Sequence, residues 1–262
     1  MLTIAGHPIL ALFAAMAAGM LSGYVTAFLQ TRLGVESILA GIISNTGLYT
    51  INLAVMGFSS NVSITGVDTV FSLFKGLVGG QWSRLILLAL IVAVIVIVLI
   101  RFFGTSLGLS IRATGDSLDM VSASSINPKA TITIGLCLAN ALTALSGCLI
   151  GEYNKFCDIN LGTGMVTIAL ASLIIGEVFA GHRGGVGKRI VCVVLGSIVY
   201  RFIIALALRL NISAEYFKLV SAVIVAVAIA APNMKGYVRL AKIKSNARKL
   251  RALSGKGDET DA

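Results

Sequence analysis

Long apolar runs alternate with short polar segments along most of this 262-residue chain. Most runs reach the roughly 20 residues that an α-helix needs to cross a bilayer core of about 30 Å. The run at 84–103 is almost entirely Leu, Ile, Val and Ala and is the least ambiguous of them. The pattern predicts an all-α, polytopic transmembrane helical bundle with about seven spans. The expected spans are residues 7–33, 37–57, 84–103, 131–151, 161–180, 190–208 and 216–232.

Small residues mark two of these runs. The first contains Gly19 and Gly23 in a G-x-x-x-G pattern, which lets two helices approach closely. We interpret this pattern as close packing inside the subunit rather than as a dimer seam. The run at 161–180 is rich in small residues and only moderately hydrophobic, so it can be a full span or a broken, re-entrant helix that lines a cavity.

Polar side chains recur at helical spacing within the second run. Asn45, Tyr49 and Asn52 fall on one face of a helix, and Asn140 occupies a similar polar stripe in the fourth run. Polar groups at membrane depth are costly unless they meet a partner or water, so this face should look inward. Two interpretations remain open: hydrogen bonds between helices, or the lining of a solute path.

A polar interruption at 107–128 separates two long apolar runs. Gly115 is expected to break the chain, Asp116 to cap the following helix, and Asp119 to lie in its first turn, where a carboxylate suits the helix dipole. We expect a short helix at 117–125 that ends before Pro128. Its apolar face is too small to enter lipid, which favours docking on another protein.

Composition excludes a soluble domain. Hydrophobic residues make up 57% of the chain and charged residues 12%, and the mean hydropathy is +0.95. The formal charge of +10 does not indicate nucleic acid, because most basic residues flank the apolar runs, where they act as topology signals and contact lipid headgroups.

The basic residues also predict the orientation. With a cytoplasmic C-terminus, alternation across seven spans places seven basic residues of the loops and eight of the tail inside, 15 of the 21. The chain then divides into a transmembrane domain, 1–234, with a cytoplasmic loop at 107–128, and a basic cytoplasmic tail, 235–262. The N-terminus falls outside, so we expect an upstream segment. The loop residues counted inside are Arg32, Arg101, Arg112, Lys129, Arg183, Lys188 and Arg189.

A few acidic residues are candidates for contacts. Glu152 and Asp158 fall on the outer side, where they can meet an external protein or form a solvated rim. Glu177 and Arg201 lie within predicted spans, and a buried ion pair between them would be structural. No cluster of potential metal ligands is evident in the sequence.

The motif at residues 108–116, Gly-Leu-Ser-Ile-Arg-Ala-Thr-Gly-Asp, is followed by Ser-Ser-Ile-Asn at 124–127. It resembles the cytoplasmic loop of ABC importer permeases of the branched-chain amino acid/ribose type. The resemblance is strongest to the tryptophan/tyrosine transport system permeases and covers roughly 8–235. Such permeases normally carry one or two further hydrophobic segments ahead of residue 8. The other matching segments are 39–42, 48–53, 140–147 and 174–177.

The resemblance implies a permease subunit of an ATP-driven importer in a bacterial cell membrane, not an enzyme. ATP and Mg²⁺ would bind a separate ATPase dimer, an extracytoplasmic binding protein would deliver the solute, and a second permease subunit would complete the path. The coupling helix would involve Arg112, Gly115, Asp116, Ser117, Asp119 and Ser124. The solute path would involve Asn45, Tyr49, Asn52 and Asn140, and the binding-protein contact Glu152 and Asp158. Amino acids, aromatic ones above all, are the expected solutes.

Two other classes were weighed. A self-sufficient secondary transporter or channel is the alternative, although intramembrane charges are few and no internal repeat is evident. A membrane enzyme would need a catalytic constellation, but the two histidines, His7 and His182, fall on opposite sides and the carboxylates are scattered.

Overall fold

The structure, a computed structural model, describes residues 2–79, 82–181 and 185–209. The chain divides into two compact units, residues 1–163 and 164–262, which are described separately.

Five helices in the described residues are long and apolar enough to cross a membrane. They overlap five of the seven expected spans and make the chain a multi-pass helical protein. The fifth expected span, 161–180, holds a shorter apolar helix, and the seventh, 216–232, lies outside the described residues. The five are α1 (Pro8–Thr31), α2 (Ser37–Val55), α4 (Ser83–Phe103), α7 (Pro128–Asn154) and α9 (Val186–Arg209).

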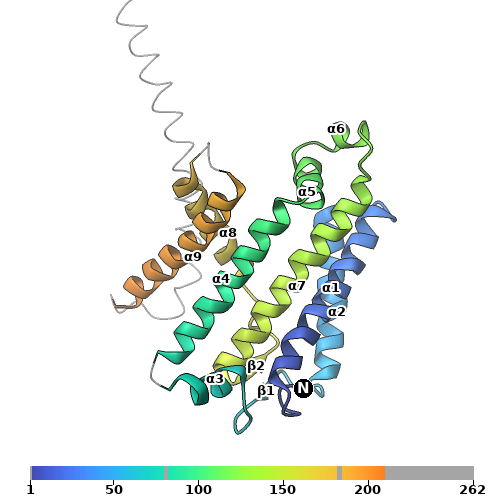
Figure 1. The fold of residues 1–262 in the computed structure, drawn as a ribbon. Coiled ribbons are helices and arrows are strands. Elements are labelled where there is room, and N and C mark those ends of the chain that lie inside the picture. Colours follow the sequence, from blue (N-terminus) through green and yellow to red (C-terminus); the bar gives the residue numbers. More distant parts are fainter. Residues whose placement is uncertain (1, 80–81, 182–184, 210–262) are drawn as a thin grey trace, which may run out of the picture. The chain divides into compact units, whose positions relative to one another are not determined.

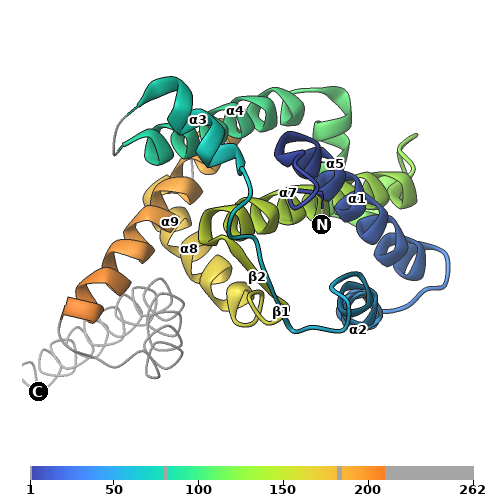
Figure 2. The same ribbon diagram turned by 90° about the horizontal axis from the view of Figure 1, so that it is seen from below.

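The first unit is built around the pair α1 and α7, which lie side by side (Figures 1 and 2). A Cβ atom at Gly19 would lie 2.5 Å from the Asn140 carbonyl oxygen, and one at Gly23 would lie 2.6 Å from that of Leu136. Because only glycine fits, the two backbones can pack directly against each other. The G-x-x-x-G prediction of packing inside the subunit is confirmed.

The neighbouring helices attach to this pair through side chains. On α2, the Ser44 hydroxyl accepts a hydrogen bond of 2.9 Å from Thr26 of α1. On the other side, an apolar cluster joins α4 to α7 and to α3 (Val70–Val78). Its buried members are Phe71, Leu87, Leu145 and Leu149.

The segment between α2 and α4 holds more structure than the polar connection that the sequence suggested. Strand β1 (Asn61–Ser63) pairs antiparallel with β2 (Phe156–Asp158), so that Val62 faces Cys157. Helix α3 follows, and the Thr69 and Ser72 side chains form a capping box at its N-terminus. Strands of three residues leave almost no periodic signal in a sequence, which is why this pairing was missed.

The second unit contains α8 (Met165–Ala180) and α9, packed against each other. A Cβ atom at Gly176 would lie 2.7 Å from the Cys192 carbonyl oxygen, so α8 and α9 also meet at a glycine. Glu177 and Arg201 are both exposed, and no ion pair joins these two described side chains. The two residues therefore do not form the buried ion pair that the sequence left open. Since α8 has 16 residues, its helical part alone is short for a full span.

Candidate functional site

The polar interruption forms two short helices at one end of the first unit, α5 (Ser106–Asp116) and α6 (Leu118–Ser122). Figure 1 shows α6 at the tip of this end, between α5 and the start of α7. We call α5, α6 and the turn that leads to α7 the tip segment, residues 106–127. A short helix was expected here, and α6 lies within its predicted range.

The boundary of this helix differs from the prediction. Gly115 and Asp116 belong to the last turn of α5, and the cap of α6 is Ser117, whose side chain accepts a hydrogen bond of 3.3 Å from the Met120 N–H. Glycine inside a helix costs only about 1 kcal/mol relative to alanine, so packing of α5 outweighs it. The break moves to Ser117, whose backbone is extended and whose hydroxyl satisfies a free N–H.

The tip segment is fixed to the transmembrane helices by buried contacts. Thr114 of α5 and Thr131 of α7 share a buried hydroxyl hydrogen bond of 2.8 Å. Gly108 packs directly on the Phe102 carbonyl of α4. On α6, Val121 is only 1% exposed. A displacement of α6 therefore transmits to α5 and α7 through packed atoms rather than through a loose loop.

Two other apolar side chains of α6 are exposed. Leu118 is 55% exposed and Met120 65% exposed, although both are apolar. Arg112, Asp116 and Asp119 are also exposed, and none of the three charged groups has a partner within the described part of the chain. Ser124 bonds to the backbone of α6, and Gly115 faces open space. A mixed surface of this kind suits a protein partner.

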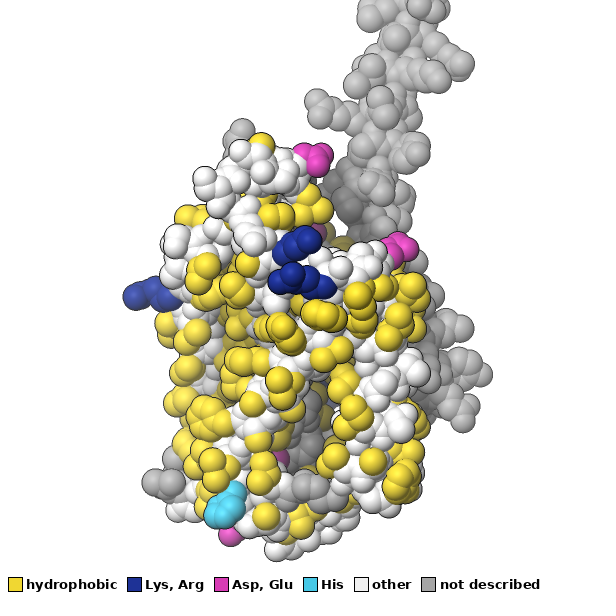
Figure 3. Space-filling model, turned by 90° about the vertical axis from the view of Figure 1, so that its right-hand side faces the viewer, with side chains coloured by type: hydrophobic (Ala, Val, Ile, Leu, Met, Phe, Trp, Pro, Cys, Tyr) yellow, Lys and Arg dark blue, Asp and Glu magenta, His cyan; other side chains and the backbone are white. Residues whose placement is uncertain are grey.

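Basic side chains cluster at this end of the first unit. The α1–α2 turn, the last turn of α4, α5 and the first turn of α7 each contribute an exposed cation. Figure 3 shows Lys and Arg side chains toward the end that carries α6 and a broad hydrophobic surface beyond them. The four residues are Arg32, Arg101, Arg112 and Lys129.

The other end of this unit contains a cavity of about 510 Å³ between α1, α2, α7 and the two strands. Asn52, Glu152 and Asp158 line it, so the structure brings together three residues that the sequence placed in two separate groups. Asn45 and Tyr49 are exposed on α2 but do not line this cavity. Asn140 donates a hydrogen bond of 3.0 Å to the Leu136 carbonyl of its own helix.

Glu152 is an internal anchor and not the exposed contact that the sequence analysis expected. Its side chain is 2% exposed, and its two oxygens accept hydrogen bonds from the Thr3 hydroxyl at 3.1 Å and from the Val70 N–H at 3.0 Å. It thus ties α7 to the N-terminal segment and to the first turn of α3, where the helix dipole favours a carboxylate. Its partners lie 149 and 82 residues away in sequence, so no local pattern could reveal them.

Three basic residues share a second cavity with Glu152. Lys75, Arg84 and Lys155 line a smaller cavity of about 160 Å³ together with its carboxylate. The Arg84 guanidinium lies 6.0 Å from the centre of the Tyr153 ring. None of the three basic side chains forms a direct ion pair with Glu152 within the described residues.

Asp158 differs from Glu152 in its surroundings. It is half-buried at the end of β2, and one carboxylate oxygen accepts a hydrogen bond of 2.6 Å from the Asn160 N–H. The other oxygen has no bond within the described residues and remains able to accept one in the cavity.

The five long apolar helices define a multi-pass helical membrane protein. No group of three or more His, Cys, Asp or Glu side chains able to hold a metal ion occurs in the part of the chain that the structure covers. The chain belongs to the permease family of branched-chain amino acid transport systems, because the model of the family described as "Branched-chain amino acid transport system / permease component" matches residues 1–229.

The chain is similar to two curated relatives. The chain is 32% identical over 227 residues to a protein named tyrosine transport system permease protein from Clostridioides difficile (strain R20291), covering 87% of this chain and 74% of the relative. It is 28% identical over 222 residues to an uncharacterized protein of Rickettsia prowazekii (strain Madrid E), covering 84% and 77%. No solved structure gives a significant match.

Proposed function

We propose that this chain is the transmembrane permease subunit of an ATP-driven ABC importer, that two permease subunits form the solute path, and that the solutes are amino acids, aromatic ones in particular. The family assignment and the tyrosine transport relative support the transport role. ATP and Mg²⁺ act on a separate ATPase dimer. The chain itself contributes a path and a mechanical connection, not a catalytic centre.

The tip segment carries this proposal. Leu118 and Met120 offer an exposed apolar contact on α6, and Val121 on the same short helix is buried against the rest of the unit. Docking of α6 in a groove of the ATPase would bury about two apolar side chains, each worth roughly 1.5–3 kcal/mol when fully covered. The exposed charges of Arg112, Asp116 and Asp119 supply ion pairs at the rim.

Coupling then follows from rigidity. When ATP closes the ATPase dimer, the docked α6 moves with it, and the Thr114–Thr131 hydrogen bond passes the displacement from α5 to α7. Since α7 packs directly on α1 through Gly19 and Gly23, the pair moves together. The bundle alternates in this way between outward-facing and inward-facing forms.

The cavity at the opposite end is proposed as the outer part of the solute path. An amino acid carries an ammonium group, and Asp158 and Asn52 offer oxygen atoms that can accept hydrogen bonds from it. Asn45 and Tyr49 continue the polar face along α2, and Asn140 lies on α7. Few contacts of this kind favour passage, because strong binding would slow release. Asp158 also lies where an extracytoplasmic binding protein would approach.

The proposed topology has seven spans with the tip segment and the C-terminal tail on the cytoplasmic side of a bacterial inner or plasma membrane. The exposed cations Arg32, Arg101, Arg112 and Lys129 at the tip end support this orientation through the positive-inside rule. The tip segment is then on the side of the membrane where an ATPase can bind it.

The test replaces the exposed apolar contacts of α6. We expect Leu118→Ser/Met120→Ser to reduce co-purification of the ATPase subunit at least about tenfold, since buried apolar anchors dominate interface energy. The control is Phe58→Ser, which removes a side chain that is 77% exposed just after α2, at the other end of the unit.

Two results would contradict the proposal. One is undiminished ATPase binding and solute-stimulated ATP hydrolysis in the double variant. The other is uptake into proteoliposomes by the purified chain alone, without ATP or partner, which would indicate a secondary transporter or channel.

A further inference from the structure

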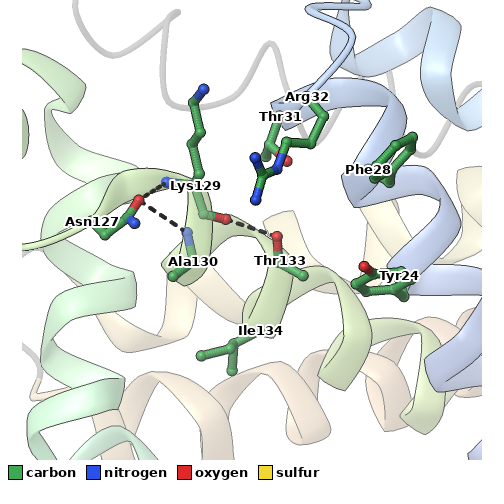
Figure 4. A pocket seen from close by; sticks show the side chains of 9 residues that line it. All are labelled: Tyr24, Phe28, Thr31, Arg32, Asn127, Lys129, Ala130, Thr133 and Ile134. Carbon is green, nitrogen blue, oxygen red and sulfur yellow. Dashed lines mark hydrogen bonds between the residues drawn. The ribbon is translucent and has the colours of Figure 1, made fainter.

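A basic pocket lies between the C-terminal turn of α1 and the N-terminal turn of α7 (Figure 4). Its volume is about 400 Å³. Arg32 follows directly after α1, and Lys129 is the second residue of α7, so two helices far apart in sequence contribute one cation each. Figure 4 shows the Arg32 side chain reaching across the pocket and the Lys129 side chain extending past the end of α7.

We propose that this pocket binds the phosphate group of an anionic phospholipid. The inference needs only that α1 and α7 cross the membrane, so it does not rest on the importer function. No acidic side chain lines the pocket, and neither Arg32 nor Lys129 has an ion-pair partner within the described residues. Two unpaired cations in the lining of one pocket favour a ligand with a negative charge.

Besides the two cations, the pocket has few free hydrogen-bond donors, the Tyr24 hydroxyl and the Asn127 side-chain NH2 group. The Thr31 and Thr133 hydroxyls lining it donate to carbonyl groups of their own helices, at 2.7 and 2.8 Å. Asn127 uses its side-chain oxygen to accept from the Lys129 and Ala130 N–H groups at the start of α7. The cations therefore supply most of the donors that a phosphate would need.

The lining changes from charged to apolar along the helices. Tyr24 and Phe28 precede Arg32 by two turns and one turn of α1, a distance of about 12 and 6 Å. On α7, Ile134 lies about 7 Å beyond Lys129 in the same direction. All three side chains are exposed, and Phe28 and Ile134 are purely apolar, whereas Tyr24 adds a hydroxyl to an aromatic ring. The cations thus lie at the ends of the spans and the apolar surface toward their middle.

This gradient matches a phospholipid and does not match a soluble anion. The headgroup phosphate lies at the level where spans end, and the acyl chains continue toward the bilayer centre, next to the apolar lower half of the pocket. Inorganic phosphate or an acidic peptide would use the cations and leave that half uncovered. Basic pockets between transmembrane helices are known to take anionic headgroups.

The test measures lipid retention by the full-length protein. The chain is purified in detergent with phosphatidylglycerol or phosphatidylcholine, and native mass spectrometry counts the bound lipids. We expect the wild type to retain phosphatidylglycerol in preference to phosphatidylcholine. Arg32→Gln/Lys129→Gln should lower this retention about tenfold or more, given the attraction of each cation for an anionic lipid.

Two further variants separate the pocket from general surface charge. Arg101→Gln/Lys188→Gln removes the same net charge from exposed residues that do not line the pocket and should leave retention unchanged. Ala130→Trp keeps both cations and fills the pocket, so it should lower retention as the charge variant does. Millimolar glycerol 3-phosphate or inorganic phosphate should not displace the lipid, because neither has acyl chains.

Several outcomes would overturn the inference. They are equal retention of the two lipids, equal losses in the two charge-removing variants, unchanged retention in Ala130→Trp, and displacement by soluble phosphate. The last of these would assign the pocket to a free anion instead.

Discussion

At the scale of single residues, contacts between helices decide which substitutions the chain tolerates. Gly19 and Gly23 let α1 touch α7, and Gly176 does the same for α8 and α9. Gly47 also lies within a long helix, but a Cβ there would meet nothing within 4 Å. Glycine is therefore needed for helix packing at the first three positions but not at Gly47.

This difference gives a direct prediction. Gly23→Ala would push a methyl group to 2.6 Å from the Leu136 carbonyl oxygen, so the helices must separate. We expect a loss of about 1–3 kcal/mol in unfolding free energy, as for other overpacked sites, and a lower Tm in detergent. Gly47→Ala should leave Tm unchanged or raise it, because alanine favours the helix. Equal Tm values for both variants would contradict the close packing.

The sequence predicted one kind of residue contact and missed another. The G-x-x-x-G spacing predicted close packing inside the subunit because both glycines lie on one helix, and the structure identifies α7 as the partner. The Thr26–Ser44, Thr114–Thr131 and Glu152 contacts join different elements, and nothing local distinguishes these residues from other polar ones. The sequence placed Asn140 among the candidates for the solute path. In the structure its side chain donates a hydrogen bond within its own helix.

At the scale of elements, the ends of the helices are organised by polar contacts rather than by apolar periodicity. Ser117 separates α5 from α6, and Glu152 anchors α3 and the N-terminal segment. The sequence predicted a short helix near 117–125 but placed the break at Gly115, because the packing of α5 that overrides a glycine is a tertiary effect. Strands β1 and β2 were not predicted at all.

The Glu152 anchor can be tested by two substitutions. Glu152→Ala leaves the Val70 N–H and the Thr3 hydroxyl without their acceptor in a buried site, which should cost about 2–4 kcal/mol of unfolding free energy. Glu152→Gln keeps a side-chain oxygen for Val70 and should cost less. The control is Glu36→Gln, at an exposed position that caps no helix through its side chain. Thermal unfolding in detergent measures all three.

Two results of this unfolding experiment would change the role assigned to Glu152. If Glu152→Ala unfolds at the same temperature as Glu36→Gln, the buried carboxylate does not hold α3 and the N-terminal segment. If both Glu152 variants are equally unstable, the charge rather than the acceptor atoms matters, and the surrounding Lys75, Arg84 and Lys155 would be its main partners.

At the scale of the whole molecule, the apolar pattern predicted the class because bilayer thickness fixes the length of a span. Five of the seven expected spans coincide with helices of sufficient length, α8 is shorter, and 216–232 lies outside the described residues. The family match then shows that this membrane bundle is a transport permease. The side of the membrane on which each end lies follows only from charge, and it decides whether an ATPase can reach α6.

Cysteine accessibility establishes on which side of the membrane α6 lies. In a variant without native cysteines, Asp119→Cys marks α6 and Asp68→Cys marks the opposite end of the first unit, and both positions are exposed. If α6 is cytoplasmic, a membrane-impermeant maleimide should label Asp68→Cys from the outside of intact cells. It should label Asp119→Cys only in inverted vesicles. Labelling of Asp119→Cys from the outside would place α6 out of reach of any cytoplasmic ATPase and contradict the account.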